Sequence, residues 1–236
     1  MDIRYFRTHE KLVEFTWPPI ISEEILMELK QVASYLNEFY GEGIKEIRKG
    51  YNSLSLRLHV DISDLDCQEL IAEFKNLPLN KGQVKSKTWH FPVFYGGTDG
   101  KDLVKLSKIH RMEPEEIIQL HSAPSYFLHF YGFLPGFMYL GGLDPKLFTP
   151  RKEQPERIIK GGSVAIGGHQ TGIYPQDSPG GWYAIGKCPV HIFDIKTDPP
   201  VQAQVGDYIR FLEVDKQTFD EIHHLSALGK YKLNYD

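Results

Sequence analysis

The chain has 236 residues, of which 41% are hydrophobic and 13% aromatic, enough to bury a globular core. Its 27 Lys and Arg residues against 31 Asp and Glu give a net charge of −4, which argues against nucleic acid and anionic membranes as main partners. The charged N-terminal segment lacks a secretory pattern, and no stretch approaches the roughly 18 apolar residues of a membrane span, so we expect a cytoplasmic protein.

The two cysteines, Cys67 and Cys188, lie far apart in unrelated sequence contexts. They offer neither a disulfide framework nor a CxxC metal or redox site. We expect two buried thiols, because free cysteine behaves as a small core residue.

Residues 1–82 predict a small α/β unit. Ser22 precedes an amphipathic helical pattern and is its expected N-cap, while Leu54, Leu56, Leu58 and Val60 alternate with polar residues as in a half-buried strand. Further strands are expected at 3–7, 12–15 and 44–48, and a second helix at 64–76. The order β-β-α-β-β-α indicates a sheet with both helices on one face. Pro78, Asn80 and Gly82 then interrupt the pattern, which sets the predicted boundary.

Residues 83–236 predict a second, β-rich unit. It opens with a strand at 87–94 and two short helices within 103–122, and a final amphipathic helix is expected at 216–228. Short strands separated by Gly and Pro turns are typical of a barrel or a sandwich. We expect these strands at 126–130, 163–166, 182–185, 191–195 and 207–214.

More than half of the chain's 21 glycines fall between Tyr131 and Gly186, among prolines and aromatic residues. Glycine suits backbone with φ > 0 or close approach to another group, and proline fixes φ near −65°. The composition therefore predicts a run of tight turns. Such turns expose backbone N–H and C=O groups, so we expect a small polar ligand or a partner chain to be held there.

Within this run, Gln170, Thr171 and Tyr174 offer amide, hydroxyl and phenol groups that suit a neutral or zwitterionic small molecule. Arg151 and Lys160 flank the turns and could bind a carboxylate or phosphate, although exposed cations are commonly just solvated.

Tyr95 opens a Gly-rich turn between a strand and a helix. This turn could present amides to an anion or be a plain connection, and it lacks the Lys-Ser/Thr of a P-loop.

The histidines and potential nucleophiles of the sequence do not form a recognisable catalytic motif. His121 ends a helical run, where it could face a cleft or, in its positive form, cap the helix; His169 lies in a turn. His223 and His224 are adjacent on a helix and poorly placed to share a metal, and Ser163 lacks a GxSxG context. We predict no metal site and assign no catalytic residue. The chain therefore has the character of an incomplete enzyme whose site a partner completes.

Six ordered blocks make the chain recognisable, and together with GYNSLSLRLHVD at 50–61 they cover nearly its whole length. The blocks are YGG at 95–97, LHSAPSY at 120–126, GFLPGFMYLGGLD at 132–144, PR at 150–151, GGSVAIGGHQTGIYP at 161–175 and SPGGWYAIGKCP at 178–189. With these blocks the chain resembles the allophanate hydrolase subunit 1 family.

The resemblance implies an α+β fold with a ferredoxin-like N-terminal domain (1–82) and a cyclophilin-like β-barrel C-terminal domain (83–236). It also implies substrate-binding or subunit-interface residues, which match the family's signature or lie in its blocks. These are Gln170, Thr171, Tyr174, Pro175, Gly180, Gly181, Trp182, Tyr139, Arg151, His121 and Tyr95. The chain departs from the pattern at His9-Glu10-Lys11, where the family usually has Gly-Asp, and at His169, which argues against a general catalytic role for that histidine.

The resemblance further implies one barrel component of an ATP-dependent 5-oxoprolinase that cleaves 5-oxo-L-proline to L-glutamate and is inactive alone. Its partners would be a C-type subunit with a related barrel and an A-type subunit of the LamB/YcsF class, and which component binds ATP stays open. Two alternatives stay open as well. One is an inhibitor of the KipI type, which binds a sensor histidine kinase and blocks its autophosphorylation; the other is a component of an allophanate or urea pathway.

Overall fold

A computed structural model of the protein describes residues 2–78 and 86–236. The chain packs into two units, residues 1–84 and residues 85–236, and each is considered by itself. The predicted boundary between residues 82 and 83 lies outside the described residues. Every helix in the described ranges is too short or too polar to span a lipid bilayer.

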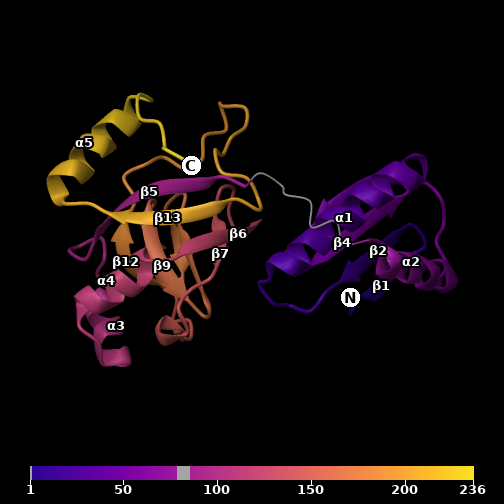
Figure 1. The fold of residues 1–236 in the computed structure, drawn as a ribbon, viewed down its shortest axis with the longest axis horizontal. Coiled ribbons are helices and arrows are strands. Elements are labelled where there is room, and N and C mark those ends of the chain that lie inside the picture. Colours follow the sequence, from indigo (N-terminus) through magenta and orange to yellow (C-terminus); the bar gives the residue numbers. More distant parts are fainter. Residues whose placement is uncertain (1, 79–85) are drawn as a thin grey trace. The chain divides into compact units, whose positions relative to one another are not determined.

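The first unit is a four-stranded antiparallel sheet with two helices (Figure 1), in the predicted element order. The strand order β1-β2-β4-β3 is that of a ferredoxin-like sheet in which β1 takes the place of the usual last strand. The elements are β1 (Arg4–His9), β2 (Leu12–Thr16), α1 (Glu23–Tyr40), the 3-10 turn η1 (Gly41–Gly43), β3 (Ile44–Lys49), β4 (Ser53–Leu58) and α2 (Asp64–Asn76).

The alternation of apolar residues along a strand and the capping residues of the helices explain where the elements of this unit form. Leu54 and Leu56 on β4 are fully buried, as the period-2 pattern predicts, whereas Val60 lies beyond the strand and is exposed. The Ser22 side chain accepts from the amide of Ile25, which confirms the predicted N-cap of α1. The second helix begins with a capping box between Ser63 and Asp66.

The second unit contains a closed seven-stranded barrel with the order β10-β7-β6-β13-β5-β12-β9. Only the β13–β5 pair is parallel among the described barrel pairings. Its elements are β5 (Thr88–Tyr95), α3 (Leu103–His110), α4 (Pro114–Ser122), β6 (Ser125–Tyr131), β7 (Met138–Gly141), the 3-10 turn η2 (Pro145–Leu147), β8 (Glu156–Ile159), β9 (Ser163–Gly167), β10 (Gln170–Ile173), β11 (Ser178–Gly180), β12 (Tyr183–Lys187), β13 (Tyr208–Glu213) and α5 (Lys216–Ala227). The α+β class with a C-terminal barrel is confirmed.

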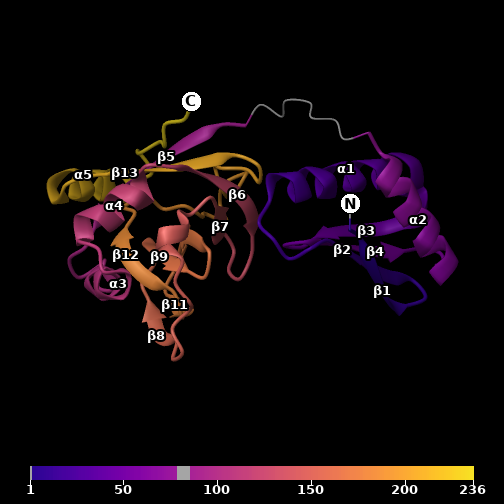
Figure 2. The same cartoon turned by 60° about the horizontal axis from the view of Figure 1, so that its bottom comes forward.

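Alternate residues of the barrel strands fill its interior. On β5 and β13 these include Phe91, Val93, Ile209 and Phe211, all at most 2% exposed. Helix α5 lies beside β5 in both ribbon views, and β8 pairs with β11 as a separate two-stranded ribbon (Figure 2). The described barrel interior is therefore packed with apolar side chains.

The predicted strand at residues 191–195 is wrong, because this segment has no regular structure. The amide of His191 donates to Ser226 Oγ at 3.0 Å and that of Asp194 to the Pro200 carbonyl at 3.0 Å. Its backbone groups are thus used in turns and a helix contact instead of a ladder. Strands β7, β8, β10 and β11 are additional to the prediction.

Candidate functional site

A cavity of about 250 Å³ lies on the outside of the barrel. We call it the aromatic pocket. It is lined by Phe133, Phe137, Tyr139, Arg151, Pro155, Tyr174, Pro179, Gly180, Gly181 and Trp182. Six of the eleven predicted site residues therefore meet in one place. Phe133 and Phe137 were missed as site residues, although both stand in the Gly- and Pro-rich run that pointed to this region.

Edge-to-face ring packing builds the pocket wall around Phe137. Its ring centroid lies 5.0 Å from that of Tyr174 and 5.4 Å from that of Trp182, at interplanar angles of 85° and 79°. Tyr139 packs against the same ring at 5.0 Å. Phe137, Tyr174 and Trp182 are at most 3% exposed, so the wall is rigid, while Phe133 is 59% exposed at the rim.

Glycines make room for this wall. A Cβ atom at Gly167 on β9 would overlap the indole ring of Trp182, and one at Gly172 on β10 would overlap the Met138 carbonyl oxygen. One at Gly180 would overlap the hydroxyl of Tyr174. The glycines of the signature thus allow large rings to lie directly on the backbone of neighbouring strands.

Arg151 supplies the positive charge of the pocket. Its guanidinium carbon lies 5.7 Å from the centroid of the Trp182 ring, a cation–π arrangement, and its side chain is exposed to solvent. The next residue fixes the loop, because the amide of Lys152 donates to the Gly181 carbonyl at 2.8 Å. Arg151 is thereby held over the rings, where its guanidinium can meet an anion.

The Lys152 side chain also holds this loop in place. Its Nζ donates to Asp102 Oδ2 at 2.7 Å and also pairs with Glu156, and Asp102 Oδ2 accepts the amide of Ala184 at 2.8 Å. Burial acts to lower the pKa of Lys152, but its hydrogen bonds with Asp102 and Glu156 raise the pKa above its ordinary value. The lysine is therefore charged and neutralised by its partners, leaving Arg151 as the cation that lines the pocket among the described residues.

The pocket can bind but carries no reactive group of its own among the described residues. Burial raises the pKa of Tyr174 to about 12, opposed by a backbone hydrogen bond with Trp182, so its phenol is neutral at physiological pH. The described lining includes no carboxylate, histidine or cysteine. The arrangement suits a small, partly apolar molecule with a negative group for Arg151.

Three other predicted residues, Tyr95, His121 and Thr171, meet inside the barrel instead of at the pocket. His121 Nδ1 lies 2.8 Å from the Tyr95 hydroxyl, and its Nε2 lies 2.8 Å from Thr171 Oγ1. Thr171 donates its hydroxyl proton to the Ala165 carbonyl at 3.1 Å, so His121 Nε2 is the donor to Thr171 and Nδ1 accepts from Tyr95. The three side chains form a buried series of hydrogen bonds that runs from Tyr95 through His121 to Thr171. Their contact with a ligand or partner stays a prediction.

His121 is fully buried and stacks on Phe211, with ring centroids 4.8 Å apart. Burial lowers its pKa to about 3, so the ring is neutral at physiological pH. It lies at the end of α4 but does not bring the positive charge expected of a helix cap.

Protonation of His121 is expected to make the fold pH-sensitive. In the unfolded chain His121 takes up a proton below about pH 6.5, whereas in the folded chain it stays neutral down to about pH 3. The free energy of unfolding therefore keeps the full contribution of neutral His121 above pH 6.5 and decreases as the pH falls below this value. The slope should approach about 1.4 kcal/mol per pH unit. Urea unfolding of wild type and His121→Gln between pH 7.5 and 5 measures the difference. Parallel pH dependences of the two proteins would contradict the assignment.

Gln170 and Pro175 lie outside the described lining of the pocket. Gln170 and Gly172 on β10 and Tyr174 just after it are spaced two residues apart, so their side chains point to the same side of the strand. Gln170 therefore shares the outer face of the barrel with Tyr174 of the pocket wall. Its Nε2 atom is buried without a hydrogen-bond partner within the described part of the chain. Pro175 directly follows Tyr174 and is half-buried outside the lining.

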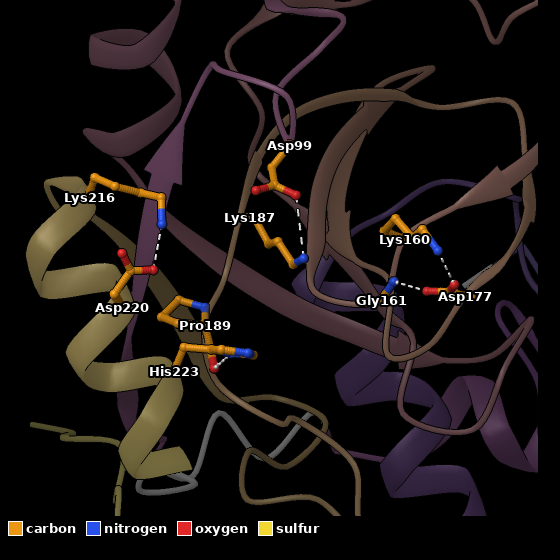
Figure 3. A network of polar contacts seen from close by, with 9 residues as sticks. All are labelled: Asp99, Lys160, Gly161, Asp177, Lys187, Pro189, Lys216, Asp220 and His223. Carbon is orange, nitrogen blue, oxygen red and sulfur yellow. Dashed lines mark hydrogen bonds and ion pairs between the residues drawn. The ribbon is translucent and has the colours of Figure 1, made fainter. Parts of the chain in front are cut away.

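Several sequence candidates have structural partners instead of free groups. Lys160 Nζ donates to Asp177 Oδ2 at 2.7 Å, and the Gly161 amide donates to Asp177 Oδ1 at 2.8 Å, which clamps the Gly-rich turn (Figure 3). His223 Nδ1 lies 3.3 Å from the Pro189 carbonyl oxygen in the same view. His169 stacks on Phe148 outside the pocket.

The Gly-rich turn after Tyr95 connects β5 to α3. The amide of Gly96 donates to the Ile185 carbonyl at 2.9 Å, and that of Gly100 to the Gly96 carbonyl at 2.7 Å. These donors are therefore used within the fold. Both cysteines are free and buried, as expected, and residues 2–78 and 86–236 contain no group of three or more His, Cys, Asp or Glu side chains suited to hold a metal ion.

Comparison with known proteins adds independent findings. Residues 1–203 match the family described as carboxyltransferase domain, subdomain C and D. The chain is 36% identical to the B subunit of 5-oxoprolinase from Haemophilus influenzae over 206 residues, 86% of this chain and 94% of that protein.

Solved structures agree. TTHA0988 superposes with a TM-score of 0.69 and 30% identity over 90% of this chain. Kluyveromyces lactis urea amidolyase superposes with a TM-score of 0.80 over 99% of this chain at 18% identity, a likeness of fold. This chain covers 40% of the first of these proteins and 16% of the second.

Proposed function

The chain belongs to the family of carboxyltransferase domains, subdomain C and D, together with a protein named as the B subunit of 5-oxoprolinase, and from this membership we propose that it is the corresponding component of an ATP-dependent 5-oxoprolinase. The complex opens the ring amide of 5-oxo-L-proline to give L-glutamate, with ATP hydrolysed in the process. The match to 94% of the Haemophilus influenzae protein and 86% of this chain supports a shared role.

The observation that carries the proposal is the aromatic pocket with its outward guanidinium. 5-Oxoproline is a small ring with one carboxylate, and the pocket offers a bidentate donor for that group in Arg151. The rings of Phe137 and Trp182 provide an apolar wall for the methylene face of the substrate. The neutral Tyr174 phenol and the buried Gln170 amide, whose Nε2 lacks a partner among the described residues, are suited to hydrogen-bond the ring amide.

The composition of the lining supports a need for partner subunits. Its described residues include no carboxylate, histidine or cysteine, and in the Gly-rich turn after Tyr95 the amides of Gly96 and Gly100 donate within the fold. We assign substrate positioning to this chain, and ATP binding and catalytic groups to the A-type and C-type partners. In this assignment the chain is inactive alone.

Reconstitution tests the proposal. The purified chain is mixed with the A-type and C-type partners of the same organism, 5-oxoproline and ATP, and released glutamate is measured. We expect glutamate from the complete mixture and none when any one component is omitted. Activity without this chain, or none in a mixture whose components assemble, would overturn the proposal. Addition of the chain to a sensor histidine kinase should leave autophosphorylation unchanged.

Two substitutions report on the polar contacts of the pocket. Tyr174→Phe removes one neutral hydrogen bond and should lower kcat/KM for 5-oxoproline roughly fivefold, since such a bond contributes about 1 kcal/mol. Gln170→Ala should have a similar effect. Steady-state kinetics of the complex measure both, with Tyr208→Phe on β13, outside the pocket lining, as the matched control. Wild-type kinetics in both variants would place the substrate elsewhere.

A further inference from the structure

The N-terminal unit contains a second and larger cavity, of about 860 Å³, which we call the acidic groove. It lies between the end of α1, the turn η1, strand β4 and α2. The buried side chains of Leu36 and Leu70 contribute to its lining. Phe39 and Val60 also line it and are 63% and 61% exposed, although both are large apolar residues. Cavities of this size hold ligands, and exposed apolar side chains beside one indicate an interaction surface.

All charged residues that line the groove in the described part of the chain are acidic. No Lys or Arg from the described residues contributes to the lining. The acidic residues are Glu38, Glu42, Asp61, Asp66, Glu69 and Glu73. Six carboxylates therefore line one groove, and an occupant with positive charge would be attracted to them.

Half of these carboxylates have structural roles and half do not. Asp61 lies 3.7 Å from Lys11 Nζ, Asp66 completes the capping box of α2, and Glu73 accepts from the hydroxyls of Tyr35 and Tyr40. The other three make no hydrogen bond or ion pair with the described residues. They are Glu38, Glu42 and Glu69, from α1, η1 and α2.

We propose that the acidic groove docks an apolar segment bearing Lys or Arg residues, supplied by a partner protein. Leu36, Leu70 and the Phe39 ring contact the apolar side chains of that segment. Glu38, Glu42 and Glu69 form ion pairs with its Lys or Arg side chains. Phe39 and Tyr40 add aromatic faces on which a cation can rest. The mode is that of an amphipathic helix in a groove, with charge selecting the partner.

Peptide binding to the full chain tests the proposal. The probe is a fluorescein-labelled peptide of about 14 leucine and lysine residues at helical spacing, followed by fluorescence anisotropy. We expect saturable binding that weakens as salt is added, and no binding of the same peptide with glutamate in place of lysine. The triple variant Glu38→Gln, Glu42→Gln, Glu69→Gln should bind the lysine peptide about tenfold more weakly.

A matched triple variant separates docking from general attraction. Glu153→Gln, Glu213→Gln and Glu221→Gln remove the same charge from exposed positions of the barrel unit outside the groove. This control should bind the lysine peptide as the wild type does. Phe39→Ser should weaken binding without unfolding the chain, because the ring is exposed. Equal weakening by both triple variants, equal binding of the glutamate peptide, or no binding to the wild type would overturn the proposal.

Discussion

Replacement of Arg151 by alanine is expected to lower kcat/KM of the reconstituted complex for 5-oxoproline by about 10- to 150-fold. The physical reason is the loss of a charge-assisted hydrogen bond to the substrate carboxylate, which contributes about 1.5 to 3 kcal/mol. Because the side chain is exposed and its loop is held by Lys152, the substitution should leave the thermal unfolding temperature nearly unchanged. Steady-state kinetics with 5-oxoproline and ATP measure the effect.

Two control variants test whether the expected effect is specific to Arg151. Arg151→Lys keeps the charge but loses the planar fork, so it should recover part of the lost kcat/KM. Arg210→Ala removes an exposed arginine from β13, outside the pocket, and should retain wild-type kinetics. If Arg151→Ala and Arg210→Ala behave alike, the carboxylate is bound elsewhere.

Gly167→Ala is expected to reduce the activity of the complex by about 100-fold or more. Its new methyl group would overlap the indole of Trp182, which is 3% exposed and packed against Phe137, so the ring has to move. A wall displaced by about 1 Å can cost a factor of about 100 in rate, and overpacking typically costs about 1 to 3 kcal/mol in stability. Near-ultraviolet circular dichroism should register the change around Trp182.

Gly168→Ala is the adjacent control for this substitution. Its Cβ would meet nothing within 4 Å, but its φ of +64° makes any side chain strained. We expect a stability loss of about 1 kcal/mol and near wild-type turnover per folded complex. Equal turnover losses in the two variants would show that backbone strain, and not the position of Trp182, governs activity.

The element order of the first unit could be predicted because local signals agreed with the fold, whereas four strands of the second unit were missed. Ser22 before an amphipathic run, the alternation through Leu54 and Leu56, and the glycine clusters all depend on residues close in sequence. The strand predicted at 191–195 is wrong because backbone groups of this segment bond within a turn and to Ser226 of a helix distant in sequence. Sequence periodicity cannot register such contacts.

The sequence named six residues that line the aromatic pocket, but it could not predict how they are arranged. The glycine run and its signature located Tyr174, Gly180 and Trp182, since the turns that expose backbone are visible in the sequence. Whether a side chain points into the barrel or away from it depends on strand register. Thr171 and Gln170 are neighbours, yet Thr171 joins the buried chain to His121 and Gln170 faces outward.

The central claim is that the aromatic pocket of this chain holds 5-oxoproline in the assembled enzyme. A structure of the complex with bound 5-oxoproline tests it most directly. We expect the substrate carboxylate within hydrogen-bond distance of the Arg151 guanidinium and the substrate ring against Phe137 and Trp182. Substrate bound entirely on a partner, with this pocket lacking it, would contradict the claim.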